Sequence, residues 1–355
     1  MIADFGQLDG QAVQAVTLQA GAMTARLITW GARLTELHVP DRDGVTADVV
    51  LGFDTLAEYQ ATDHYFGATC GRYGNRIANG AFALAGQAVQ VDCNERGNHL
   101  HGGRQGFDRK HWAITDLGAD HVTFAAVSED GEMGFPGRCS LRAAYRLTAL
   151  ALTITMTADT TKTTVMNLVN HSYFNLAGQG SGTILGHDLQ INAAFYTPVD
   201  GALLATGQVL SVNGTPFDFR TAKPIGRDLA ALSAVAEGIA DTGGGYDHNW
   251  CLGGAGALMR DCATLTDPAS GRRMTLRTTE PGVQVYTCGN ITDRVAAKAG
   301  RRMARFGGMT FETQKFPGSP NHAHFPDCTL HPGQTYRHVM EFAFFTDGAP
   351  AGTFP

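Results

Sequence analysis

Hydrophobic and polar residues alternate along much of this chain. Two stretches, 139–147 and 151–159, change character at every second position. In the first, Leu141 and Tyr145 fall on one side of an extended chain and Arg142 falls on the other. Alternation with a period of two is typical of a half-buried β-strand. The pattern therefore predicts a strand in each stretch.

Turn residues separate these stretches from others of the same kind. A Gly- and Pro-containing segment, 130–137, predicts a long hairpin turn before the first strand. Further short strands are predicted within 86–95 and 273–287. Helical patterns are few. Short helices are predicted over 55–61 and 227–238, and the ambiguous stretch 293–307 is interpreted as a loop excursion.

The 355 residues could form one large β domain or two ordinary domains. We find no linker, no charge block and no internal repeat of 20–50 residues. The 44 glycines are spread along the chain without a strict period, as expected for residues that form turns between strands. Many short strands with regular turns predict an all-β fold, a single large antiparallel β-sandwich with few short helices.

Composition narrows the class of function. The net charge is −6 and no run of Lys or Arg exceeds two residues, so neither a nucleic-acid nor a membrane-surface partner is indicated. No stretch approaches 18 apolar residues, and residues 1–13 lack the features of a signal peptide. Seven scattered cysteines without a CxxC pair suit reduced thiols. We therefore expect a cytoplasmic protein.

Polar side chains gather in a few segments that otherwise look like core or turn. The segments are 71–80 (GRYGNRIANG), 94–103 (NERGNHLHGG), 166–178 (MNLVNHSYFNLAG), 243–250 (GGGYDHNW) and 311–326 (FETQKFPGSPNHAHFP). Burying an unpaired polar group costs roughly 1–3 kcal/mol. These segments are therefore the candidates for a functional site.

Two of the polar residues are candidates for acid–base chemistry. Glu312 lies in an apolar run, where partial desolvation would raise its pKa and make it a better base; the alternative is a solvated or Arg-paired glutamate. His171 can act as acid or base near neutral pH, or it can be a core histidine bonded to a carbonyl. The nearby amides of Asn170 and Asn175 could orient a ligand and line a wet cleft, or satisfy a sheet edge.

Two H-x-H pairs raise the possibility of a metal. His99 with His101, and His322 with His324, have the spacing that puts two rings on one face of a strand. A mononuclear zinc hydrolase is thus the alternative, although both pairs lie in loop-like sequence and no HExxH motif is present. We therefore expect no metal site.

The remaining candidates suit hydroxyl recognition. Arg76 beside Asn75 could bind hydroxyl or carboxylate groups, or be a surface arginine in a turn. Asp247 could accept two hydroxyl hydrogen bonds or hold its loop as an Asx-turn. Motifs for nucleotide cofactors and for a serine nucleophile are missing. The set favours a polyol ligand and simple proton transfer without a cofactor.

Taken together, six segments in one order closely resemble the aldose 1-epimerase (galactose mutarotase) family. The segments are GRYGNRIANGAF, NHLHGG, NLVNHSYFNLAG, FYTPVDGALLATGQVLSVNGTPFDFR, YDHNW and FETQKFPGSPNHAHFP, and the resemblance runs from about residue 15 to about 346. It implies a galactose mutarotase-like supersandwich, one domain over 1–355. It also implies a monosaccharide substrate, no metal, no cofactor, and a monomer or homodimer.

The resemblance also implies roles for particular residues. Glu312 matches the family's general base and His171 its general acid, which we expect to be ionised and protonated, respectively, in the free enzyme. The residues that match the family's sugar-binding positions are Asn75, Arg76, His101, Asp247 and Gln284. Gly74, Val169 and Cys251 depart from the family pattern, so the sequence does not select one aldose.

Two alternatives of the same fold remain. A hexose-6-phosphate 1-epimerase would need cations for the phosphate, for which Arg72, Arg76 and Arg109 are candidates. A non-catalytic sugar-binding protein would be expected to lack Glu312 or His171, and both are present.

Overall fold

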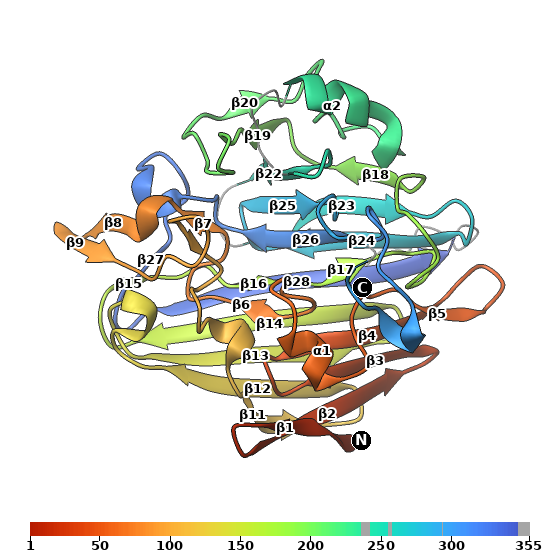
Figure 1. Cartoon of the computed structure of the whole chain (residues 1–355), viewed down its shortest axis with the longest axis horizontal. Coiled ribbons are helices and arrows are strands. Elements are labelled where there is room, and N and C mark those ends of the chain that lie inside the picture. The colour runs from red at the N-terminus through yellow and green to blue at the C-terminus, as the bar shows by residue number, and fades with distance from the viewer. Residues whose placement is uncertain (236–241, 255–257, 293, 347–355) are drawn as a thin grey trace.

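The computed structural model describes residues 1–235, 242–254, 258–292 and 294–346. Antiparallel sheets dominate it, and in Figure 1 their strands lie one above another across the view. Three sheets of nine, six and five strands contain most of the strands of the described chain. The predicted all-β sandwich with few short helices is confirmed.

The nine-stranded sheet runs through the middle of the molecule (Figure 1). Its strands, in spatial order, are β11 (Ala113–Leu117), β12 (His121–Ser128), β13 (Cys139–Leu147), β14 (Ala151–Thr160), β28 (Thr335–Thr346), β24 (Arg272–Thr278), β23 (Arg260–Thr266), β18 (Asp188–Ile191) and β21 (Lys223–Pro224). The long strand β28 pairs with β14 and β24, so the end of the described chain joins two distant segments of the sheet.

The strands β13 and β14 confirm the two alternating stretches. Leu141 and Tyr145 are buried and Arg142 is exposed, as the period of two requires. Across the ladder Tyr145 stands opposite Ile154, so apolar side chains of neighbouring strands share the inner face. The predicted turn at 130–137 lies between β12 and β13 and contains one 3₁₀ turn.

The two smaller sheets pack their apolar side chains into the same core as the large sheet. The five-stranded sheet contains β1 (Ile2–Leu8), β2 (Gln11–Ala20), β3 (Met23–Ile28), β4 (Arg33–Pro40) and β5 (Thr46–Asp48). The six-stranded sheet contains, in spatial order, β17 (Tyr173–Phe174), β26 (Met309–Gln314), β25 (Gly282–Tyr286), β22 (Asp247–Cys251), β19 (Phe195–Thr197) and β20 (Leu210–Ser211).

Strand β26 is buried on both faces. Thr313 bonds His338 of β28 through a 2.7 Å contact, so that face of β26 looks onto the large sheet. Glu312 therefore points the opposite way, since neighbouring side chains in a strand alternate. Short strands and loops cover this second face, among them β16 (Val169–Asn170), which packs on β26. A carboxylate on this strand is thus enclosed without lying in the apolar core.

Smaller elements complete the described chain. Two two-stranded pairs lie near the segments that cover β26: β6 (Thr69–Cys70) with β16, and β7 (Arg76–Ile77) with β10 (His99–Leu100). A hairpin of β8 (Ala81–Leu84) and β9 (Gln87–Gln90) projects from the molecule (Figure 1). One further pair joins β15 (Thr164–Val165) and β27 (Thr329–Leu330). The strands predicted within 86–95 and 273–287 are thereby confirmed as β9, β24 and β25.

Both predicted short helices are present in the described residues. The helix α1 (Leu56–Gln60) begins with a capping box in which Thr55 and Glu58 bond each other's backbone N–H. The helix α2 (Leu229–Val235) confirms the second prediction, whose last residues, 236–238, lie outside the described residues. In 293–307 the described residues form a loop with one 3₁₀ turn, Lys298–Gly300. Among the described residues, no helix has the length and apolar character needed to span a bilayer.

Candidate active site

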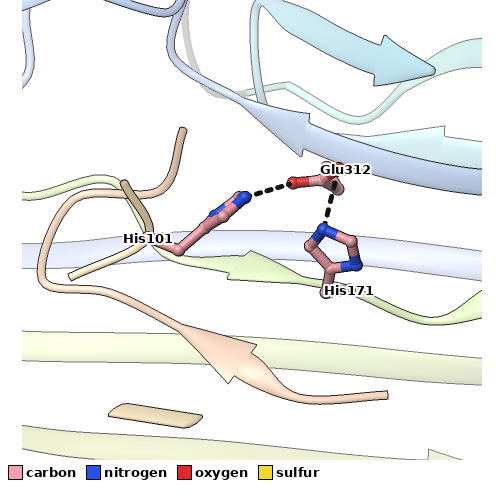
Figure 2. Close-up of side chains that lie close together, drawn as sticks. All are labelled: His101, His171 and Glu312. Atoms are coloured by element: carbon pink, nitrogen blue, oxygen red, sulfur yellow. Dashed lines mark ion pairs between the residues drawn. The ribbon is translucent and has the colours of Figure 1, made fainter. Parts of the chain in front are cut away.

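Three side chains from distant parts of the sequence meet around one carboxylate (Figure 2). Glu312 comes from β26, His171 from the turn between β16 and β17, and His101 from the residue after β10. The Nε2 atom of His171 lies 3.4 Å from Oε1 of Glu312, and Nε2 of His101 lies 3.9 Å from Oε2. All three side chains are buried, Glu312 with only 2% of its surface exposed.

The three residues line a cavity of about 190 Å³. Six of the seven predicted site residues are among those that line it: Asn75, Arg76, His101, His171, Asp247 and Glu312. The seventh, Gln284, stands behind Asp247 and donates from Nε2 to Oδ1 at 2.6 Å. Gln284 is opposite Glu312 in the β25–β26 ladder, so one sheet face forms the floor of the cavity. The structure thus brings the predicted residues together.

Burial decides where the proton of the Glu312–His171 pair resides. Removal from water, reinforced by the charge of Asp247, raises the pKa of Glu312 to about 8. The same burial lowers the pKa of His171 to about 3. Both groups are therefore mostly neutral near pH 7, with the proton on Glu312. The expectation of an ionised glutamate and a protonated histidine in the free site is wrong, because desolvation disfavours both charges.

His101 is held as a hydrogen-bond donor. Its Nδ1 accepts a hydrogen bond from the backbone N–H of Asn75 at 3.2 Å, so in the neutral ring the hydrogen sits on Nε2. Burial and the neighbouring His171 lower the pKa of His101 well below its usual range, so the ring stays neutral. The Nε2–H therefore faces the cavity and Glu312.

This tautomer bears on metal binding. Ligand atoms of His101, His171 and Glu312 lie within 4.8 Å of one another, a spacing that could hold a metal ion. A metal would need a lone pair on the His101 Nε2, and that atom carries the ring hydrogen while the Asn75 N–H occupies the other nitrogen. The trio is therefore better suited to hydrogen bonding and proton transfer.

Each predicted H-x-H pair contains at least one histidine whose ring is bonded to the backbone. Nδ1 of His99 lies 2.8 Å from the Asp92 carbonyl oxygen, and its Nε2 accepts from the Gly102 N–H at 3.1 Å. His101 has a left-handed backbone (φ 51°), so the alternation of a strand does not extend to it. Nε2 of His324 lies 2.8 Å from a backbone carbonyl oxygen. These H-x-H pairs therefore do not form the two-histidine site on which the zinc alternative was based.

Comparison with known proteins agrees with this geometry. Residues 14–343 match the family model described as aldose 1-epimerase. The chain belongs to the aldose 1-epimerase family. It is therefore an enzyme, an epimerase of the isomerase class. The galactose mutarotase of Bos taurus is 40% identical to it over 332 residues, 94% of each chain.

More distant members of the family agree along the same length. The aldose 1-epimerase of Escherichia coli (strain K12) is 35% identical over 343 residues, 96% of this chain and 97% of that protein. The crystal structure of galactose 1-epimerase from Lactobacillus acidophilus NCFM superimposes with a TM-score of 0.83 at 27% identity, covering 98% of both chains. The galactose mutarotase-like fold is thus confirmed.

The amides of this epimerase around His171 do not line the cavity as we expected. Asn167 donates from Nδ2 to the Gly74 carbonyl at 3.0 Å and accepts from the Lys315 N–H at 2.9 Å. Asn170 accepts from the Ser172 hydroxyl at 2.6 Å. The bonds of Asn167 join segments that are distant in sequence, whereas the bond of Asn170 to Ser172 is local. These amides satisfy buried backbone and hydroxyl groups, which is why a core-like segment carries so many of them.

Substitution of Asn175 tests this structural role. Its Nδ2 donates to the Gly307 carbonyl at 2.9 Å and its Oδ1 accepts from the Ala177 N–H at 3.0 Å. Asn175→Ala is expected to lower the free energy of unfolding by about 1–3 kcal/mol, because buried backbone groups lose their partners. Asn321→Ala, which removes an exposed amide that bonds the Ala81 carbonyl, is the control with a smaller loss. Urea unfolding measures both, and equal losses would contradict the prediction.

Aromatic side chains complete the cavity wall, and the sequence did not single them out. The ring of Tyr65 lies 4.7 Å from the ring of His101 and 5.6 Å from that of His171, measured between centroids. Tyr173 packs 5.0 Å from His171 on another side. Because Tyr65 sits in an irregular turn with φ 55°, no periodicity marks it. These rings fix the two imidazoles and keep water away from them.

Proposed function

We propose that this enzyme interconverts the α and β anomers of free aldoses by acid–base ring opening, and that residues 1–355 act as one domain. The observation that carries the proposal is the Glu312–His171 pair, 3.4 Å apart and buried in a cavity lined by hydroxyl-binding groups. A carboxyl and an imidazole at this distance can hold and exchange a proton without help from solvent. No metal or cofactor is needed for the chemistry.

Glu312 acts as general base and His171 as general acid. Glu312 takes the proton of the C1 hydroxyl while His171 gives a proton to the ring oxygen. The bond between C1 and the ring oxygen then breaks, leaving an open-chain aldehyde and a hydroxyl. Rotation about C1–C2 presents the other carbonyl face. Glu312 returns its proton to the aldehyde oxygen, His171 regains the hydroxyl proton, and the ring closes as the opposite anomer.

The neutral pair of the free site fits this cycle. The pair of protonated Glu312 and neutral His171 carries one titratable proton. The pair of ionised Glu312 and protonated His171 carries the same number. Transfer of that proton across the 3.4 Å contact converts the free form into the form that opens the ring. The neutral form is also the state of the pair while the open-chain sugar is bound. The enzyme thus needs no exchange with solvent during one turnover.

The remaining predicted residues bind the sugar. The Nε2–H of His101 donates to an oxygen near the reacting carbon. Asp247, held by Gln284, accepts from sugar hydroxyls, while Asn75 and Arg76 contribute donors from the same cavity lining. A site that bonds hydroxyls rejects analogues that lack them, because its own buried groups are left unpaired.

The pH dependence follows from the number of protons on the pair. With a pKa of about 8 for Glu312 and about 3 for His171, the pair holds one proton between these values. We expect kcat/KM to be level from pH 5 to 7 and to fall about tenfold per pH unit above pH 8, where the free enzyme loses that proton. Polarimetry in overlapping buffers measures the profile. A catalysed rate that rises through pH 9 would contradict the prediction.

The substrate class is tested by polarimetry on freshly dissolved α-D-galactose, α-D-glucose and α-D-xylose, with EDTA present. Galactose comes first because the Bos taurus relative is a galactose mutarotase. We expect the enzyme to speed the approach to anomeric equilibrium, with EDTA making no difference, and the fastest sugar identifies the preferred substrate. Absence of acceleration on every free aldose would overturn the proposed function.

The hexose-6-phosphate alternative finds less support. Arg72 is only 1% exposed and donates to the Pro136 carbonyl at 2.7 Å, so its guanidinium serves the interior. Arg109 is paired with Asp63 at 2.6 Å. Of the three arginines suggested for a phosphate site, only Arg76 lines the cavity. A phosphate in the cavity would therefore meet Arg76 and Arg96, both within ion-pair distance of Glu95, and not the cluster suggested from the sequence.

The cysteines support a location in a reducing compartment. All seven are unpaired and five are buried. Unpaired thiols are typical of the cytosol, where disulfides are rare. We propose a cytoplasmic location on this ground.

A further inference from the structure

Two arginines, Arg76 and the more exposed Arg96, line the cavity, and the carboxylate of Glu95 lies within ion-pair distance of both. Nε and Nη2 of Arg76 lie 3.2 Å from Oε2 and Oε1 of Glu95, respectively, a two-point contact between a planar fork and both carboxylate oxygens. The Arg76 side chain is 10% exposed and that of Glu95 is 21% exposed. Both residues line the cavity that contains Glu312.

Glu95 is held in place by its own backbone. Its N–H donates to the Asn98 carbonyl at 3.0 Å, and the Asn98 N–H donates back at 2.8 Å. The Asn98 side chain accepts from the Asn79 N–H at 2.8 Å. This loop leads directly into β10, which pairs with the strand that carries Arg76. The carboxylate is therefore a fixed part of the cavity wall.

We propose that Glu95 determines specificity for neutral sugars: by pairing with Arg76 it keeps aldoses that carry an anionic group, such as uronates or sugar phosphates, out of the cavity. The inference rests on the proposed function and concerns which aldoses it accepts. An arginine fork without a partner binds carboxylate or phosphate at two points. Here that fork is occupied, and an anion approaching it meets the negative charge of Glu95.

Neutral hydroxyls are not excluded by this arrangement. Nη1 of Arg76 makes no hydrogen bond within the described residues, so one donor group of the fork remains for a sugar oxygen. Asp247 stands on the floor of the same cavity and raises the pKa of Arg76 together with Glu95, although burial opposes it. The arginine therefore stays charged but presents a limited, oriented donor.

The test compares Glu95→Gln with the wild type on α-D-galactose and on α-D-galacturonate, followed by polarimetry. We expect the ratio of kcat/KM for galacturonate to that for galactose to rise by about tenfold or more, mainly through a lower KM for the anion. Asp63→Asn is the matched control, because Asp63 also lines the cavity but is exposed and pairs with Arg109. It should leave the ratio unchanged.

Two results would overturn the proposal. If Glu95→Gln lowers both activities equally, the carboxylate merely positions Arg76. If Asp63→Asn changes the ratio as much as Glu95→Gln does, the selectivity comes from the total negative charge around the cavity and not from Glu95 in particular. Glu95→Asp keeps the negative charge beside Arg76, and it should keep rejecting galacturonate even if the glutamine variant folds poorly.

The proposal and the proposed function can fail separately. If the wild type does not accelerate any anomerisation, calorimetric binding of galacturonate and galactose to the same proteins replaces the rate. A wild type that binds galactose and rejects galacturonate, with rejection lost in Glu95→Gln, supports the selectivity of Glu95 without the reaction. Equal binding of both sugars by the wild type contradicts it.

Discussion

Glu312→Gln is expected to lower kcat/KM for the interconversion of galactose anomers by roughly 10²- to 10⁴-fold, the contribution of one well-placed base. The amide has the shape of the carboxyl group and can keep the 3.2 Å contact with the Thr310 hydroxyl. It cannot take the proton of the C1 hydroxyl. Polarimetry at several concentrations of α-D-galactose should therefore show a loss in kcat with a modest change in KM.

Stability provides the control for this variant. The pKa of about 8 in the folded protein lies above the ordinary value of 4.5, so folding protects the proton on Glu312. The stability of the wild type should therefore fall as pH rises from 4.5 through 8, by an amount on the order of a few kcal/mol. Glu312→Gln lacks this ionisation, and its melting temperature should exceed that of the wild type increasingly toward pH 8. An inactive variant that is also unfolded would contradict this reasoning.

His171→Asn is expected to cost a similar roughly 10²- to 10⁴-fold in kcat/KM, because no other group stands ready to protonate the ring oxygen. Nδ1 of His171 has no hydrogen-bond partner within the described residues, so the side chain does not serve as a structural bond to a carbonyl. Circular dichroism should therefore show a folded variant. His331→Asn, which changes an exposed histidine that contacts Thr163, is the matched control with full activity. A His171→Asn variant retaining a tenth or more of the activity would exclude the proposed acid.

The regular strands could be predicted from the sequence because each carries its own periodic signal. Strand β13 begins and ends where the alternation does, at Cys139 and Leu147. The loops that cover β26 have no such period. Glu312 becomes enclosed only when these loops fold over it. The neighbouring Phe311 and Phe316 were enough to suggest a raised pKa of Glu312, but the sequence could not show that Glu312 and His171 are both neutral.

Single-residue backbone geometry limited the prediction of the site. The H-x-H spacing suggested one shared face for His99 and His101, but the left-handed conformation of His101 turns the chain. The amides of Asn170 and Asn175 were attributed to a possible cleft because partners such as Tyr145 and Gly307 lie far away in sequence. Resemblance to a family identified the residues that meet, whereas their protonation and partners required the three-dimensional structure.

The central claim is that Glu312 and His171 act as one unit that passes a single proton. The most direct test is a double-mutant cycle on α-D-galactose with the wild type, Glu312→Gln, His171→Asn and the double variant. If the pair is one unit, the double variant is no slower than the slower single variant, because either change already removes the cycle. If the two losses multiply in the double variant, the residues contribute independently and the shared proton is contradicted.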